Sequence, residues 1–221
     1  MRCFIILANK LSPMKKLFYL LILFVFFSCA KKIFSEKWTK QLAPEEFRAR
    51  FETTQGNFDI YAKRSWSPNG VDRLYTLIKH NYYVEMPIFR VVPNFVAQFG
   101  IHKDSLVNKA WNNFTLKDEP VIAKNDSMSI SFARGGVNTR TNQIFINLKK
   151  NNRLDTLRYS GVTGFPVVAK VTNGFENVLK FYDKYGDKLG FRQDSIQKYG
   201  NSFIKRKYPK VDFINKAYIL K

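Results

Sequence analysis

The sequence predicts a mainly β domain, built as a closed barrel or a sandwich, with two or three helices. Three observations favour this fold class. Many short apolar or alternating segments are separated by turn residues, whereas few stretches have helical periodicity. The chain contains 21 Phe and 11 Tyr, and aromatic residues favour strands. Its length of 221 residues suits one domain with extensions, because domains usually have about 100–200 residues.

The first expected elements are a β-hairpin and a helix. Residues 47–51 alternate apolar and charged side chains, residues 55–57 form a tight turn, and residues 58–62 form the returning strand. Ser67 is a suitable N-cap before Pro68, which favours the first position of a helix. The apolar residues that then share one face, before the helix ends near residue 80, are Val71, Leu74, Leu77 and Ile78.

Five more strands are expected after this helix, and a second helix follows the last of them. The strands comprise residues 88–92, 95–99, 127–133, 143–148 and 165–171. A glycine-rich loop, residues 134–140, separates the third of these strands from the fourth. Asn173 and Gly174 form a turn into the second helix. The apolar residues of that helix are Phe175, Val178, Leu179 and Tyr182. Residues 186–221 follow as a C-terminal extension, to which the sequence assigns no function.

Residues 1–28 have the pattern of a secretory signal peptide. Lys15 and Lys16 precede an unbroken apolar run, residues 17–27, and small residues follow it. This run is too short for a transmembrane helix, which needs about 20 apolar residues. Met14 is an alternative start of the protein, because the residues before it look like an upstream extension.

Cys29 directly follows Ser28 at the end of the apolar run, and this arrangement resembles the lipobox of bacterial lipoproteins. The resemblance implies cleavage between these two residues and lipidation of Cys29, with residues 29–45 as a tether. Several acyl chains hold a protein at a membrane more firmly than one, at about 0.8 kcal/mol per buried CH₂. We therefore expect a lipid-anchored protein on the periplasmic side of a bacterial cell envelope, at either membrane. An ordinary cleaved signal with a chance cysteine remains the alternative.

The composition argues against several classes of protein. Both cysteines, Cys3 and Cys29, lie in the N-terminal region, so the domain has no disulfide framework, cysteine metal cluster or cysteine nucleophile. His80 and His102 lack the spacing of a metal site, and we expect neither a metal nor another cofactor. The net charge is +20, but the basic residues are scattered, so no nucleic-acid partner is expected. Charge-driven binding to nucleic acid or anionic lipid stays as a less favoured alternative.

Two segments carry a family resemblance. The first, residues 89–100, reads F-R-V-V-P-N-F-V-A-Q-F-G. The second combines S-F-A-R at residues 131–134, N-T at residues 138–139 and Q-I-F-I at residues 143–146. Their order and spacing resemble the cyclophilin family of peptidyl-prolyl cis-trans isomerases. The corresponding family motifs are F-x-R-[VI]-[VI]-P-x-F-x-x-Q-x-G, shifted here so that Phe89 directly precedes Arg90, and the series S-M-A-[NR], P-N-[ST] and S-Q-F-F-I. The resemblance covers residues 46–185.

The resemblance implies an eight-stranded antiparallel barrel that a helix closes at each end. It also implies a shallow groove on the outer face of the barrel, which binds proline-containing polypeptides and isomerises the prolyl bond. The reaction breaks no covalent bond, so it needs neither a nucleophile nor a metal. We expect a monomer that assists the folding of envelope proteins.

The resemblance assigns roles to the matching residues. Arg90 and Gln98 take the catalytic positions: the guanidinium donates a hydrogen bond to the nitrogen of the twisted amide, and Gln98 steadies it. Gln143 orders the groove, and the backbone of Ala133 and Arg134 binds the peptide before the proline. The other substrate-binding positions, which surround the proline ring, are Phe95, Val96, Phe145, Leu154 and Phe165.

Departures from the family pattern affect the expected site. Phe165 stands where many members have His, Arg153 stands where some have Trp, and Val96 replaces a usual Met. Residues 101–113, which include Trp111, replace a glycine-rich loop. Catalysis is then retained with a changed substrate preference, or it is reduced. The alternative is a cyclophilin-like module that holds proline-containing segments as a chaperone with little turnover.

Overall fold

The computed structural model describes residues 33–221, and the predicted signal peptide, its cleavage site and Cys29 lie outside these residues. The strands of the main sheet are β1 (Glu46–Thr53), β2 (Gly56–Lys63), β3 (Met86–Pro87), β4 (Arg90–Val92), β5 (Val96–Phe99), β6 (Ser129–Phe132), β7 (Ile144–Asn147), β10 (Val167–Asn173) and β11 (Phe213–Ile219). Strands β8 (Arg158–Tyr159) and β9 (Val162–Thr163) form a separate hairpin. All seven strands that the sequence predicts are found, within a few residues of the expected bounds.

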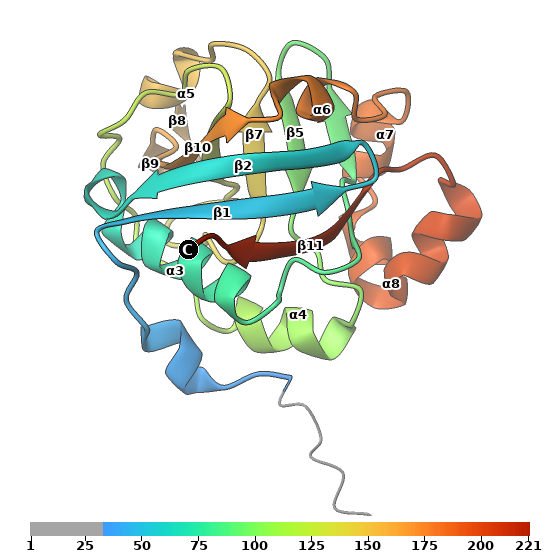
Figure 1. Ribbon diagram of the computed structural model, residues 1–221, viewed down its shortest axis with the longest axis horizontal. Helices are drawn as coiled ribbons and strands as arrows, with labels where there is room; N and C mark the ends of the chain where they lie inside the picture. Colours follow the sequence, from blue (N-terminus) through green and yellow to red (C-terminus); the bar gives the residue numbers. More distant parts are fainter. Residues whose placement is uncertain (1–32) are drawn as a thin grey trace, which may run out of the picture. The chain divides into compact units, whose positions relative to one another are not determined.

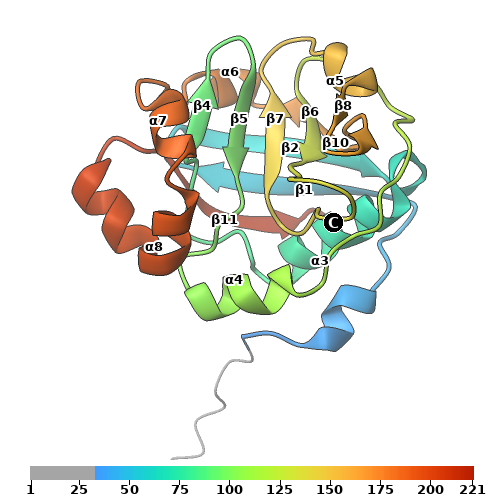
Figure 2. The same cartoon turned by 180° about the vertical axis from the view of Figure 1, so that it is seen from behind.

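In the described part of the chain, nine strands form one sheet in the order β3-β11-β1-β2-β10-β6-β7-β5-β4. Neighbouring strands are antiparallel throughout. The sheet is strongly curved, so that β1, β2 and β11 cross over β4, β5 and β7 (Figures 1 and 2). Its end strands, β3 and β4, are separated in the chain only by Ile88 and Phe89. The sheet therefore folds back towards its own beginning.

The antiparallel, mainly β architecture is confirmed, but the expected number of eight strands is wrong. The difference arises because β11 inserts between β1 and β3, and the two-residue strand β3 pairs only with β11. No ladder joins β3 to β4 within residues 33–221, so hydrogen bonding does not close the barrel there.

The hairpin of β1 and β2 shows how the sequence pattern builds the core. Alternate residues of β1, Phe47, Ala49 and Phe51, are buried in the main core, because successive side chains of a strand point to opposite faces. Phe51 lies opposite Phe58 of β2, and their stacked rings have centroids 4.9 Å apart. Gly56 closes the turn at φ +109°, a backbone conformation that favours glycine.

The helices are α3 (Pro68–Lys79), α4 (Ser105–Asn112), α5 (Arg153–Thr156), α6 (Phe175–Leu179), α7 (Gly186–Gly190) and α8 (Gln193–Lys207), with 3-10 turns η1 (Glu36–Lys40) and η2 (Arg64–Trp66). Helix α3 has the expected bounds, but the Ser67 side chain does not cap it. The Ser67 hydroxyl donates to Glu119, and this carboxylate accepts the backbone N–H groups of Asn69 and Gly70 instead. A carboxylate suits this place because the N-terminus of a helix carries partial positive charge.

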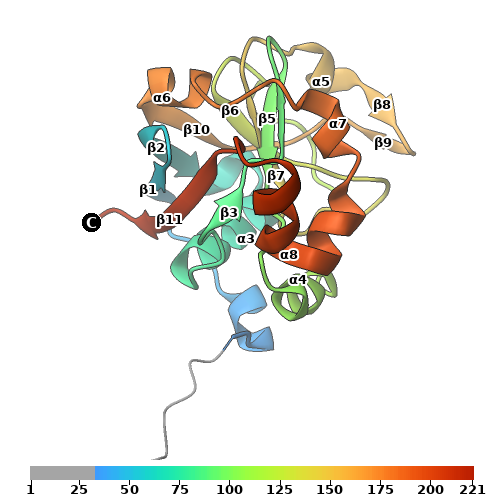
Figure 3. The ribbon, with the colours of Figure 1, turned by 90° about the vertical axis from the view of Figure 1, so that its right-hand side faces the viewer.

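The expectation that one helix closes each end of the barrel stays a prediction. Helix α3 packs against β10 and β11, whereas the second expected helix, α6, has only five residues. Residues 101–113, for which no helix was predicted, contain α4, which lies beside α8 (Figure 3). Trp111 of α4 is buried in the main core, and its ring meets that of Phe34 at 5.2 Å.

The C-terminal residues, expected as an extension, supply parts of the domain. Strand β11 lies inside the main sheet, and α7 and α8 pack through a second hydrophobic cluster. The buried members of this cluster are Phe89, Ile101, Leu189, Ile196, Phe203, Ile204 and Val211. The end of the expected tether packs on the domain as well, since Trp38 stacks on His80 at 4.0 Å. No helix within residues 33–221 is long and apolar enough to cross a membrane.

Candidate functional site

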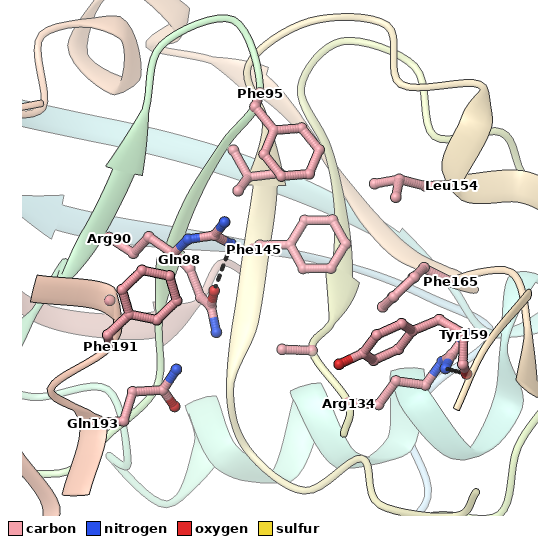
Figure 4. Close-up of a pocket in the computed structure, with 13 residues that line it drawn as sticks. Arg90, Phe95, Gln98, Arg134, Phe145, Leu154, Tyr159, Phe165, Phe191 and Gln193 are labelled. Atoms are coloured by element: carbon pink, nitrogen blue, oxygen red, sulfur yellow. Dashed lines mark hydrogen bonds between the residues drawn. The ribbon is translucent and has the colours of Figure 1, made fainter. Parts of the chain in front are cut away.

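A groove with a volume of about 310 Å³ lies on the face of the sheet that is turned away from the main core (Figure 4). Strand alternation creates its floor. In β5, Ala97 and Phe99 point into the core, so Val96 and Gln98 point into the groove. In β7, Phe145 is directed in the same way. The period of the strands therefore places the motif residues on one surface.

Two walls flank this floor. We call them the hairpin wall, residues 153–165 with α5, β8 and β9, and the α7 wall, residues 186–193. Figure 4 shows their labelled side chains on opposite sides of Phe145. The groove-lining residues are Leu154, Tyr159 and Phe165 on the hairpin wall and Gly190, Phe191 and Gln193 on the α7 wall.

Apolar side chains form a compact seat in the groove. Its buried members are Val96, Phe145 and Leu154, and the residues packed on them are Phe95, Ala133, Leu157 and Phe165. The ring of Phe165 meets that of Phe145 edge to face, with centroids 5.8 Å apart. The five apolar residues predicted to surround a proline ring are therefore brought together, and the departure at Phe165 makes this part of the seat apolar.

Arg90 projects from β4 at the edge of this seat. Its Nη1 donates to Oε1 of Gln98 at 3.3 Å, which follows from the direct pairing of these residues across β4 and β5. Its Nε donates to Oδ1 of Asp187 at 2.6 Å, and its Cζ lies 5.7 Å from the ring centre of Phe95. The side chain of Arg90 is 25% exposed, so the guanidinium reaches solvent while three neighbours hold it.

Glutamine side chains connect the floor to the α7 wall. Nε2 of Gln98 donates to Oε1 of Gln143 at 3.0 Å, and Nε2 of Gln143 donates to Oε1 of Gln193 at 3.1 Å. All predicted site residues of the domain line the groove except Gln143. Gln143 does not line the groove itself, but it accepts a hydrogen bond from Gln98 and so orients that side chain.

The side chain of Arg134 supports the hairpin wall. Its guanidinium donates to the carbonyl oxygens of Tyr159, Val162 and Gly164 at 2.8–3.1 Å. It also covers the ring of Phe165, with 4.3 Å between Cζ and the ring centre. Burial lowers the pKa of Arg134. The sequence predicts only a backbone role for Arg134, and the structure adds a side-chain role, since the guanidinium holds the hairpin wall through its carbonyl oxygens.

Four groove residues were not predicted: Tyr159, Gly190, Phe191 and Gln193. Three of them belong to the α7 wall, which lies outside both motifs. Phe191 is 84% exposed, and an apolar residue inside a polar segment is a weak sequence signal for a binding surface. Arg153, one of the departures, is exposed and does not line the groove.

Comparisons with known proteins agree with this arrangement. The model of the family described as cyclophilin type peptidyl-prolyl cis-trans isomerase/CLD matches residues 48–200. A peptidyl-prolyl cis-trans isomerase of Acinetobacter baylyi is 26% identical over 144 residues, which are 65% of this chain and 76% of that protein.

The fold is similar to that of a cyclophilin type peptidyl-prolyl cis-trans isomerase from Cryptosporidium parvum. Its crystal structure has a TM-score of 0.58 and 18% identity, and the match covers 80% of this chain and 98% of that one. A second structure of the C. parvum protein, in the presence of the dipeptide Ala-Pro, has a TM-score of 0.56 and 17% identity over 79% and 99% of the two chains. With its family motifs gathered in one groove, the chain belongs to the cyclophilin-type peptidyl-prolyl cis-trans isomerases.

Proposed function

We propose that this isomerase binds proline-containing segments of folding polypeptides in the groove and that Arg90 stabilises the twisted prolyl amide. Rotation about the amide bond meets a barrier of about 18–20 kcal/mol, because resonance joins nitrogen and carbonyl. In the twisted geometry the nitrogen regains a lone pair. A hydrogen-bond donor that is already in place for that lone pair lowers the barrier, by roughly 3–4 kcal/mol for one well-placed donor.

The position of Arg90 is the observation that carries this proposal. The guanidinium lies beside an apolar seat and is held by Gln98 and by the ring of Phe95. An arginine keeps its charge at any physiological pH and presents several donors in a rigid plane. A proline seated on Phe145 would have its ring nitrogen near this edge of the groove.

The apolar seat supports proline as the residue that is bound. Phe145, Leu154 and Val96 offer little hydrogen bonding, and a prolyl ring lacks an N–H to satisfy. The related C. parvum protein has been crystallised in the presence of Ala-Pro. We therefore propose X-Pro segments as the ligand of this groove, bound by a monomer without a cofactor or a nucleic-acid partner.

Turnover of a proline peptide by the purified domain tests the mechanism. Magnetisation-exchange NMR on a saturating X-Pro peptide gives the exchange rate of the bound peptide, and titration gives its dissociation constant. Arg90→Ala should lower the bound exchange rate about 10²–10³-fold, while affinity changes much less. Arg48→Ala, a change on β1 outside the groove, is the control.

Two other outcomes of this assay have definite meanings. Full turnover in Arg90→Ala would contradict the role of the guanidinium. Tight binding with negligible exchange in the unmodified domain would favour the alternative, a module that holds proline segments as a chaperone.

We also propose that the protein is held on the periplasmic side of a bacterial envelope by lipid on Cys29. The support is the signal-peptide pattern and the position of this cysteine after Ser28. Mass spectrometry of the mature N-terminus from a bacterial membrane fraction tests the proposal. The expected result is a chain that begins with acylated Cys29 and that Cys29→Ala releases from the membrane, whereas Cys3→Ala leaves it unchanged. A mature chain whose Cys29 is unmodified would contradict the lipid anchor. It would also contradict the proposal that this isomerase assists the folding of envelope proteins at a membrane.

A further inference from the structure

We infer that the α7 wall belongs to the active groove and that Asp187 is a positioning residue for Arg90. The inference rests on the proposed role of Arg90. Neither family motif contains Asp187, which lies in a segment to which the sequence assigns no function. Its assignment therefore comes from contacts in the structure.

The α7 wall is built closely onto the strand that carries Arg90. Helix α7 packs on β4, and Gly190 lies directly against the arginine side chain. A Cβ atom at position 190 would stand 3.0 Å from Cδ of Arg90 and 3.2 Å from its Cγ. Glycine at this position therefore leaves the space through which the arginine stem passes. Leu189 of the same helix is buried in the second hydrophobic cluster and fastens the helix there.

The contact with Asp187 selects which donors of Arg90 stay available. The carboxylate takes Nε–H, Gln98 takes one N–H of Nη1, and Nη2 donates to no acceptor in residues 33–221. The Cζ atom of Arg90 lies over the ring of Phe95, 5.7 Å from the ring centre. Nη2 and the second N–H of Nη1 are thus left to donate to a bound peptide.

The physical effect is to order a flexible side chain before the substrate arrives. A free arginine side chain samples many rotamers, and a charge-assisted hydrogen bond at Nε restricts this freedom. The Asp187 side chain is 47% exposed, and exposed ion pairs contribute little to global stability. We therefore expect removal of the carboxylate to affect turnover more than folding.

The test measures bound exchange rate, peptide affinity and melting temperature for Asp187→Asn and Asp187→Ala. We expect the exchange rate to fall about tenfold, with affinity unchanged within about twofold and the melting temperature almost unchanged. Asp183→Asn removes a nearby carboxylate that pairs with Lys184 instead, so it controls for the change in charge. It should behave like the unmodified protein.

A double variant separates positioning from a general structural role. In the Arg90→Ala background, Asp187→Ala should cause no further loss, because the two residues act through one group. A tenfold loss in both backgrounds, or no loss in either, would overturn the inference. If Arg90→Ala itself keeps full activity, the proposed mechanism fails first, and the two failures remain distinguishable.

A separate observation, the exposure of Phe191, carries a second proposal. We propose that Phe191 forms an apolar subsite for a substrate side chain adjacent to the proline. At 84% it is the most exposed large hydrophobic residue in the described part of the chain, and it lines the same groove as the proline seat. Its neighbours are fixed, since Gly190 packs on Arg90 and Gln193 is hydrogen-bonded to Gln143. The ring is thus held in solvent by an ordered segment.

The position of the ring decides which part of a substrate it meets. Phe191 is not a member of the apolar seat, and in Figure 4 it lies beside Arg90, with Phe145 between it and Phe165. A proline in the seat would therefore leave Phe191 to a neighbouring residue of the peptide. An apolar or aromatic substrate residue next to the proline would bury the exposed ring of Phe191 on binding. Because burial of apolar surface is favourable, the groove should prefer substrates with such a residue.

Peptides with Phe or Gly immediately before or immediately after the proline test this subsite. The unmodified domain should prefer Phe over Gly at one of the two positions by about fivefold in kcat/KM. Phe191→Ala should remove that preference and leave the Gly peptides within about twofold. Phe175→Ala, which removes an exposed ring outside the groove, is the control. Equal losses for all peptides, or an unchanged preference, would overturn the proposal.

Discussion

The two walls of the groove are held in different ways. The hairpin wall is fastened by polar contacts: Arg134 binds three of its carbonyl oxygens, and Asp155 accepts the backbone and side-chain N–H groups of Asn125 at 2.9 Å. The α7 wall is fastened by apolar packing around Leu189 and by the contact of Asp187 with Arg90. One wall therefore depends on motif residues, and the other depends on the C-terminal part of the chain.

The difference shows how one groove can join residues of the two family motifs to residues that lie outside both motifs. The floor contains residues that the family motifs specify, such as Phe145, and Arg134 of the second motif fastens the hairpin wall. The α7 wall adds a carboxylate beside Arg90 and an exposed aromatic ring at the rim. Variants that loosen one wall at a time should show whether the two contribute separately to turnover.

The largest effect is expected from Leu189→Ala, which removes a side chain that is 1% exposed in the cluster under α7. Losing such a side chain typically costs about 2–5 kcal/mol, because burial is lost and a cavity remains. Hydrogen exchange should become faster in α7 and α8, and turnover should fall as in Asp187→Ala. Leu179→Ala, at a site that is 60% exposed, should stay within about 0.5 kcal/mol. Equal loosening of β8 and β9 would contradict the separation of the walls.

The sequence predicted the floor better than the walls, for physical reasons. Val96, Gln98 and Phe145 lie on predicted short strands, and the shared face of Val96 and Gln98 follows from their spacing of two residues. Strand β11 was missed because it pairs with β1, far away in the chain, and such pairing leaves no local pattern. The contact of Asp187 with Arg90 spans 97 positions and depends on the same long-range packing.

Local chemistry misled one expectation and left another incomplete. Ser67 has a residue type that suits an N-cap, yet Glu119 from a distant loop competes for the same N–H groups. Arg134 was given a backbone role because the motif tolerates several side chains there. The β8–β9 hairpin, which gives its guanidinium three carbonyl partners, has strands of two residues each and no clear sequence pattern.

A smaller effect on stability is expected from Arg134→Ala, which tests the hairpin wall. The change removes three hydrogen bonds to carbonyl oxygens and the cover over Phe165. Each bond contributes about 0.5–1.5 kcal/mol, so part of the hairpin should loosen and kcat/KM should fall about tenfold. Arg134→Lys should recover little, since a lysine cannot span three acceptors with a rigid fork. Arg158→Ala, an exposed change on β8, is the control, and an equal loss there would contradict the role of Arg134.

The smallest effect is expected from pH, acting on His102 near the α7 side of the molecule. His102 stands between Ile101, a member of the second hydrophobic cluster, and Lys103, whose carbonyl lies against Gly200 of α8. The backbone N–H of Asp104 donates to its Nδ1 at 3.0 Å, so the folded state holds the neutral ring. Burial lowers the pKa of His102 below its ordinary value of 6.5.

The sign of the pH effect follows from this lowered pKa. As pH falls through about 6.5, the unfolded chain takes up a proton at this residue before the folded chain does, so the free energy of unfolding decreases. His102→Asn keeps a side-chain acceptor for the backbone N–H of Asp104, but an asparagine cannot be protonated between pH 7.5 and pH 5.5. Urea unfolding at pH 7.5 and pH 5.5 should therefore show a smaller loss of stability in the variant than in the unmodified domain. An equal loss in both proteins would mean that other groups cause the acid sensitivity. If the loss is smaller and hydrogen exchange at pH 5.5 quickens in α7 and α8 before it does in β8 and β9, acid weakens the α7 wall while the hairpin wall persists.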